Sequence, residues 1–265
     1  MSTFLYGANI STNGIRQHYL RYGGKGRPLI VVPGITSPAV TWGFVGERLG
    51  ETFDTYIFDV RGRGLSASGQ SLDYGLDTLA DDLAANIRSL GLDNTSVLGH
   101  SMGARIAIRA ASQHGLELDR LVLVDPPVTG PGRRPYPSAL SWYLESIRLA
   151  NAGCGVEQMR RFLPSWSDEH LGLRAEWLHT CDEEAVIRSY NDFHDTNIHA
   201  DLPRITMSTL LVVAGKAGVI LPQDAEEILS LLPRGSSRII PNAGHMIPWD
   251  DFEGFFQAIL PFFAP

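Results

Sequence analysis

The stretch Gly-His-Ser-Met-Gly at 99–103 has the residue types and the spacing of a serine nucleophile, G-x-S-x-G. It joins an apolar run at 96–98 to a helical pattern, so Ser101 stands on a tight strand-to-helix turn with its hydroxyl exposed. The two glycines are needed because neighbouring backbone passes too close for a Cβ. An oxyanion beside Ser101 would meet the N–H of Met102 and the positive end of the helix dipole. Five residues alone also fit an ordinary loop, so the context must decide.

A second backbone donor could reach the same place. The β-branched run at 29–32 ends in Pro33, Gly34 and Ile35. The N–H of Ile35, in this loop, could supply the other half of an oxyanion hole beside the serine. Pro-Gly alone favours a plain strand-ending turn, so this role depends on where the loop lies.

The elements that must position these residues alternate between strand and helix. Runs typical of buried strands occur at 29–32, 96–98 and 121–124, and further segments with strand character occur at 56–58, 209–213 and 237–240. Helical apolar spacing occurs at 42–49, 79–90 and 252–262. Before them, Asn13-Gly14 and the alternating segment 15–22 predict an antiparallel hairpin. The repetition predicts an α/β fold with a mostly parallel sheet and right-handed crossovers.

Ligands of such sheets bind at the carboxyl ends of the strands, where Ile35, Ser101 and Asp125 all fall. After Asp125 the composition changes to a proline-rich stretch, and the chain then has a helical pattern without an evident strand. We therefore expect an inserted helical cap at 127–202, with the core formed by 1–126 and 203–265.

Composition and charge argue against several classes of partner. Lys and Arg number 22 against 29 Asp and Glu, a net charge of −7 without a basic block, so nucleic acid is not an expected partner. No apolar run has membrane-spanning length, and the first residues lack the layout of a signal peptide, which favours a cytoplasmic protein without a membrane partner. Cys154 and Cys181 are too few for a disulfide framework. The histidines of the cap lack the paired helical spacing of a metal site, and we expect no cofactor or metal.

Four motifs, in this order, resemble the α/β-hydrolase fold superfamily. They are Pro33-Gly34, the loop Asp59-x-Arg-Gly-x-Gly-x-Ser66, the serine motif and Asn242-Ala-Gly-His245. Each is weak alone, but four in order at the family's spacing are highly specific. The resemblance covers the full length and implies a mostly parallel eight-stranded sheet flanked by helices, with an inserted helical cap. It also implies a catalytic triad with Ser101 as nucleophile and His245 as base.

The acid of that triad departs from the family's usual pattern. The family commonly carries it after the strand that follows the cap, but residues 215–218 here read Gly-Lys-Ala-Gly and contain no carboxylate. Asp125 ends the preceding central strand at the same sheet edge as Ser101, and a few enzymes of the fold place the acid there. We assign Asp125, which must accept a hydrogen bond from the Nδ1–H of His245. Asp224 is the alternative, although its place after Pro222 is typical of a helix cap.

Within the superfamily the whole chain, including the displaced aspartate, resembles the deformylases of aerobic nicotinate degradation. The resemblance implies hydrolysis of an N-formyl amide to formate and maleamate through a formyl-serine. A carboxylesterase or carbon–carbon bond hydrolase of an aromatic degradation pathway remains an alternative, as does a non-catalytic ligand-binding member of the fold. The oligomeric state is left open.

A maleamate-type substrate carries a carboxylate that must be met inside a largely apolar pocket. Burying it unpaired is costly, so the site needs a cation or several neutral donors. Arg133 and Arg134 are the candidates that lie nearest in the chain to Asp125. The cap also offers Arg160, Arg161, Arg174 and Arg188, which the sequence does not rank.

Overall fold

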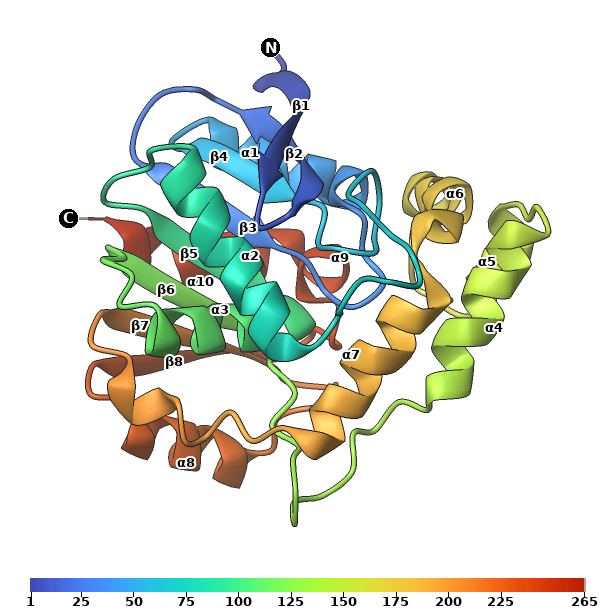
Figure 1. The fold of residues 1–265 in the computed structure, drawn as a ribbon. Helices are drawn as coiled ribbons and strands as arrows, with labels where there is room; N and C mark the ends of the chain where they lie inside the picture. The colour runs from blue at the N-terminus through green and yellow to red at the C-terminus, as the bar shows by residue number, and fades with distance from the viewer. Residues whose placement is uncertain (265) are drawn as a thin grey trace.

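A computed structural model describes residues 1–264 and contains one eight-stranded sheet with helices on both faces (Figure 1). The strands are β1 (Phe4–Thr12), β2 (Ile15–Tyr22), β3 (Pro28–Val32), β4 (Asp54–Phe58), β5 (Ser96–His100), β6 (Arg120–Val124), β7 (Ser208–Ala214) and β8 (Gly235–Ile240). Their order in the sheet is β1-β2-β4-β3-β5-β6-β7-β8. The pairs β1–β2 and β2–β4 are antiparallel, and the other five pairs are parallel. The predicted fold class is confirmed.

The sheet begins with the hairpin that Asn13-Gly14 predicts. Both residues have positive φ, 47° and 75°, and Thr12 pairs with Ile15 across the turn. Positive φ at both central positions is what the tight two-residue hairpin turn requires, and Asn and Gly adopt it at the lowest cost. The antiparallel ribbon therefore follows from the local sequence.

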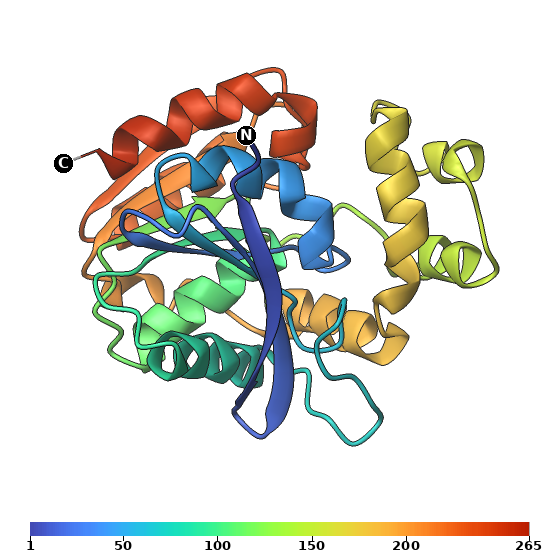
Figure 2. The ribbon, with the colours of Figure 1, turned by 90° about the horizontal axis from the view of Figure 1, so that it is seen from above.

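Two layers of helix bury the central strands on both faces (Figures 1 and 2). Leu29 and Val31 of β3 belong to a buried cluster with the helices at 43–50 and 252–263, whereas Ile30 and Val32 belong to a second cluster with the helices at 76–89, 102–113 and 222–231. Successive side chains of a strand point to opposite faces, so a strand between two helical layers must be apolar throughout. The helices of these layers are α1 (Gly43–Gly50), α2 (Leu76–Ser89), α3 (Met102–Gln113), α8 (Pro222–Leu231) and α10 (Phe252–Phe263).

Residues 127–202, called the cap segment below, follow β6 and end at the first residue of η3 (Leu202–Arg204), the short helix that precedes β7. The helical pattern predicted there is present, without a strand in this range. Its elements are α4 (Leu140–Asn151), α5 (Val156–Arg160), α6 (Asp168–Trp177), η2 (Leu178–Thr180) and α7 (Glu183–Asp195). In Figures 1 and 2, α4, α5 and α6 stand beside the sheet rather than on its faces. The boundaries of the cap as a domain stay a prediction.

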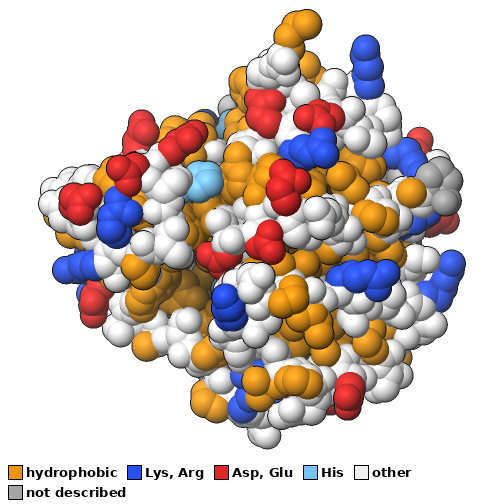
Figure 3. Space-filling view, turned by 180° about the vertical axis from the view of Figure 1, so that it is seen from behind, with side chains coloured by type: hydrophobic (Ala, Val, Ile, Leu, Met, Phe, Trp, Pro, Cys, Tyr) orange, Lys and Arg blue, Asp and Glu red, His pale blue; other side chains and the backbone are white. Residues whose placement is uncertain are grey.

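Arg105 of α3 ties both ends of the cap segment to the core. Its buried guanidinium donates to the carbonyls of Pro127 and Thr129, where the segment begins, and of Asp192 and Thr196, where it ends. Seen from behind, a recess with hydrophobic side chains in its wall lies between the cap segment and the rest of the molecule (Figure 3). The remaining helical elements are η1 (Ala39–Trp42), η3 (Leu202–Arg204) and α9 (Ile247–Asp250). In the described part of the chain, no helix has the length and apolarity needed to cross a membrane.

The turn from β5 into α3 is packed against backbone on two sides. A Cβ on Gly103 would lie 1.9 Å from the carbonyl oxygen of Val32, and a Cβ on Gly99 would lie 2.4 Å from that of Gly103. Backbone cannot move away as a flexible side chain can, so both glycines are required by space and not by φ. This explains physically why the serine motif carries glycine at its two ends.

We predict that Gly103→Ala lowers the free energy of unfolding by at least about 1–3 kcal/mol, the usual cost of forcing a methyl group into a packed region. The matched control is Gly172→Ala in α6, where the new Cβ would meet only a Val156 methyl at 3.7 Å. That change should stabilise by roughly 0.5–1 kcal/mol because alanine is the better helix former. Urea unfolding measures both, and equal stabilities for the two variants would contradict the prediction.

Candidate active site

Ser101 occupies a strained backbone position at the carboxyl end of β5. Its φ is 54° and its ψ is −117°, a conformation that residues other than glycine rarely adopt. Its N–H donates to the carbonyl of Val124 at 2.8 Å, and its own carbonyl accepts the N–H of Ala104 at 3.0 Å. These bonds hold the turn between β5 and α3, so the strain is supported by the sheet on one side and by the helix on the other.

Ser101, His245 and Asp125 form a continuous hydrogen-bonded chain. The Oγ of Ser101 lies 2.9 Å from Nε2 of His245, and Nδ1 of His245 lies 2.7 Å from Oδ2 of Asp125. Asp125 is fully buried, and its other oxygen accepts the N–H of Ala214 at 3.2 Å. A carboxylate on Nδ1 fixes the tautomer that leaves Nε2 free to accept the serine proton. The arrangement can therefore activate Ser101 as a nucleophile.

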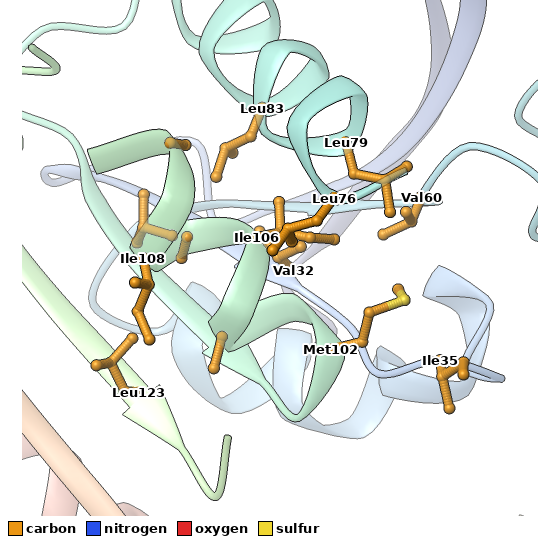
Figure 4. Packing of buried hydrophobic residues seen from close by; sticks show 14 of the residues in the cluster. Val32, Ile35, Val60, Leu76, Leu79, Leu83, Met102, Ile106, Ile108 and Leu123 are labelled. Carbon is orange, nitrogen blue, oxygen red and sulfur yellow. The ribbon is translucent and has the colours of Figure 1, made fainter. Parts of the chain in front are cut away.

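Two backbone N–H groups near Ser101 and His245 are free to bind an oxygen of a ligand. Within residues 1–264, neither the N–H of Ile35 nor that of Met102 donates to a protein acceptor. Met102 is the first residue of α3, where backbone N–H groups lack helical partners. Figure 4 shows the side chains of Ile35 and Met102 at the margin of the buried cluster that includes Leu76 and Leu79. Packing thus fixes both residues while their N–H groups stay unpaired.

The glycine-punctuated loop after β4 is structural, and it positions the loop that contains Ile35. The carboxylate of Asp59 accepts the N–H of Ala39 at 2.6 Å and that of Leu65 at 3.0 Å. Arg63 is buried and donates from Nε to the carbonyl of Ile35 at 3.0 Å. The motif from Asp59 to Ser66 therefore serves the site through the backbone that it holds in place.

His100 holds the backbone of His245 through a hydrogen bond. Its Nε2 lies 2.9 Å from the carbonyl oxygen of His245, which makes this nitrogen the donor. Burial, together with the neighbouring His245, lowers the pKa of His100 to about 3, so the ring is neutral at physiological pH. The contact fixes the backbone of the loop that carries His245.

Two tyrosines of the cap segment lie beside His245. The hydroxyl of Tyr136 lies 3.4 Å from Nε2 of His245. The hydroxyl of Tyr143 donates to the hydroxyl oxygen of Tyr136 at 3.3 Å. Burial raises the pKa of both tyrosines, so both hydroxyls are protonated at neutral pH. The sequence carries no motif or spacing that would have identified either residue.

A cavity of about 240 Å³ opens onto Ser101 and His245. The core contributes the loop from Gly34 to Ser37, and the cap segment contributes aromatic side chains, Trp142, Tyr143 and Trp166. The mixed apolar and polar lining is that of a site for an organic molecule, and the volume limits that molecule to a small one. Arg174 also lines this cavity and is the one Lys or Arg among its lining residues.

Asp224, the alternative acid, lies elsewhere. Its carboxylate accepts the N–H of Leu221 at 2.8 Å at the start of α8 and pairs with Arg134. It is a helix cap, as its position after Pro222 indicated, whereas Asp125 contacts His245.

The structure does not bring Arg133 and Arg134 into the cavity, which corrects the prediction that they meet a substrate carboxylate. Arg133 pairs with Glu227 of α8, and Arg134 pairs with Asp224 and with the carbonyl of Val219. Closeness in the chain to Asp125 was the basis of the prediction, but the chain leaves the sheet edge after Asp125 and runs toward α8, whose carboxylates take both guanidinium groups. Arg174 enters the cavity from a distant helix instead.

Comparisons with known proteins point to one family. The model of the alpha/beta hydrolase family matches residues 29–258. An N-formylmaleamate deformylase of Pseudomonas putida is 62% identical, over 97% of this chain and 96% of its own length. The crystal structure of an N-formylmaleamic acid deformylase, also from Pseudomonas putida, has a TM-score of 0.93 at 56% identity and covers 96% of this chain and 100% of that one. An esterase from Exiguobacterium antarcticum, with a TM-score of 0.79 at 22% identity over 99% of both chains, is alike in fold.

The buried His100 predicts a dependence of stability on pH. Its pKa falls from 6.5 to about 3 on folding, so the unfolded chain binds a proton that the folded chain does not. Stability is therefore fully present above about pH 6.5 and is lost as pH falls toward 3, by about 2 kcal/mol between pH 7 and pH 5. His100→Gln keeps an N–H donor but does not titrate, and it should lose that slope. Urea unfolding at both pH values measures the difference; parallel profiles would contradict it.

Proposed function

This chain belongs to the alpha/beta hydrolase family, and from that membership we propose that it is a serine hydrolase that deformylates N-formylmaleamate to maleamate and formate. One observation carries the reaction class, namely the hydrogen-bonded chain from Ser101 through His245 to Asp125 at a cavity of small-molecule size. The choice of substrate is supported by the likeness to the deformylases, which extends over nearly the whole chain.

Acylation begins when Oγ of Ser101 attacks the formyl carbon and Nε2 of His245 takes the hydroxyl proton. The imidazolium that forms is stabilised by Asp125, whose carboxylate stays ionised. The N–H groups of Ile35 and Met102 then donate to the oxyanion of the tetrahedral intermediate. Their freedom from protein acceptors supports this assignment.

The leaving group explains why a triad of this kind suffices. The formylated nitrogen also bears the acyl group of maleamate, so a second carbonyl shares its lone pair, and the nitrogen leaves more easily than that of an ordinary amide. His245 returns the proton to this nitrogen as the bond breaks, and maleamate departs. Water, deprotonated by His245, then attacks the formyl-serine, which releases formate and restores Ser101.

The cellular compartment and the partners of the enzyme stay predictions from the sequence. We expect the enzyme to act in the cytoplasm on a small molecule, without nucleic acid or membrane as a partner. The experiment that tests the function is a formate assay with N-formylmaleamate, with an aryl acetate as the comparison substrate. Stoichiometric formate supports the proposal. Rapid turnover of the aryl ester without formate release would instead favour a carboxylesterase.

We predict that Ser101→Ala and His245→Ala each abolish formate release while the circular dichroism spectrum stays that of the wild type. The members of a triad act as a unit, so the double variant should be no slower than either single one. Retention by either variant of more than a few per cent of the wild-type rate would show that the reaction does not pass through this serine.

The acid is tested by a matched pair of substitutions. Asp125→Asn should lower kcat by a factor on the order of 10⁴, because an amide N–H facing Nδ1 selects the wrong tautomer of His245. Asp224→Asn should change kcat little, since Asp224 caps α8. Steady-state formate release measures both, and the reverse order of effects would assign the acid to Asp224.

A further inference from the structure

Three buried arginines have no carboxylate within ion-pair distance in the part of the chain that the structure describes, namely Arg63, Arg105 and Arg174. Arg63 and Arg105 each donate to four protein oxygens, which solvate their charge. Arg174 donates only to the carbonyl and hydroxyl oxygens of Thr36, at 3.1 and 3.2 Å, and its Nε has no partner. Of the three, Arg174 alone lines the cavity.

The position of Arg174 in its helix makes this arrangement costly. Leu171, Ala175 and Leu178 share the buried side of α6 and η2 with Arg174, at helical spacing, so a cation interrupts an apolar stripe. Burial lowers the pKa of the Arg174 guanidinium, as it does for Arg63 and Arg105, but Arg174 has only Thr36 as a hydrogen-bond acceptor where each of the other two has four oxygens. A buried charge without a partner is strongly unfavourable, and a bound anion would remove that cost.

We propose that Arg174 is the binding residue for the carboxylate of the substrate, as part of the proposed deformylase function on which this inference rests. The ligand class is a small acyl amide that carries one carboxylate. Arg174 and Ser101 line the same cavity, and Arg174 contacts Thr36, the residue after Ile35. A substrate whose carboxylate is held by Arg174 would therefore have its formyl group in the cavity that contains Ser101. The single carboxylate among the lining residues, that of Asp250, accepts the N–H of Gly244 and makes no ion pair with Arg174.

A competing explanation is that Arg174 only holds the oxyanion loop through the carbonyl of Thr36. Loss of that support would slow every substrate alike, because the N–H of Ile35 would be displaced for all of them. Loss of a carboxylate contact would slow only substrates that carry the charge. The ratio of kcat/KM for a charged substrate to kcat/KM for a neutral one therefore distinguishes the two roles.

The experiment compares kcat/KM for N-formylmaleamate with that for its neutral methyl ester. Arg174→Gln should lower the acid-to-ester ratio on the order of 10- to 100-fold, mainly through KM, because a hydrogen-bonded charge pair is lost. Arg148→Gln, which removes an exposed cap arginine paired with Glu183, should leave the ratio unchanged. An Arg174→Gln ratio equal to that of the wild type would overturn the proposal and leave Arg174 as a support of the oxyanion loop.

A binding measurement on the wild-type protein tests the same point without a variant and without turnover. By calorimetry, maleamate should bind at least about 10-fold more tightly than maleamide, its neutral diamide, and Arg174→Lys should retain part of that difference because it keeps the charge. Equal affinities in the wild type would overturn the carboxylate subsite even if Arg174→Gln does not fold. If the wild type releases no formate but still prefers maleamate, the deformylase function fails while the subsite stands.

Discussion

The positive φ of Ser101 is the constraint on which the rest of the site depends. It turns the chain sharply from β5 into α3, which exposes the hydroxyl and leaves the N–H of Met102 free beside it. The turn fits because Gly103 lets α3 approach the carbonyl of Val32 in β3 more closely than any side chain would allow. The strain at one residue is thus supported by strand pairing and helix packing on both sides, so the packing of the core also fixes the position of the Ser101 hydroxyl.

The place of Asp125 goes together with a different contribution from the residues after β7. Asp125 at the end of β6 contacts His245, and the residues after β7 hold the histidine loop through backbone contacts. Gly215 donates to the carbonyl of Ile240, and Lys216 donates to that of Ala243, on the path to His245. A Cβ on Gly215 would lie 2.6 Å from the carbonyl oxygen of Pro241, so the absence of a side chain there allows the two loops to touch.

The sequence predicts the features that depend on local turns and periodicity, and it does not predict contacts that depend on how distant segments pack together. The hairpin at Asn13-Gly14, the buried strands and the meeting of Ser101 with Asp125 at one sheet edge follow from turn residues, periodicity and topology. The helices of the cap followed from the sequence, but the cation of the cavity did not, because closeness in the chain suggested Arg133 and Arg134 whereas Arg174 lines the cavity. Spacing held a usable signal in that case: an arginine at the i+3 position of an apolar stripe is a buried cation that needs a partner. Tyr136 had no such signal, since its contact with His245 exists only once the cap segment is packed.

The charges of the site are separated in a way that suits the proposed reaction. Asp125 and the imidazolium of His245 balance each other in the transition state, and neutral N–H groups meet the oxyanion, so the reacting centre needs no further cation. Arg174 donates to the carbonyl of Thr36, the residue after Ile35. In the proposed reaction it balances the charge of the substrate carboxylate, which does not change as the bond breaks. A contact of constant strength stabilises the bound substrate and the transition state equally, so it governs which molecules are held and not how fast the bond breaks. Selection of the substrate by the cap and catalysis by the core are on this view separate functions of one cavity.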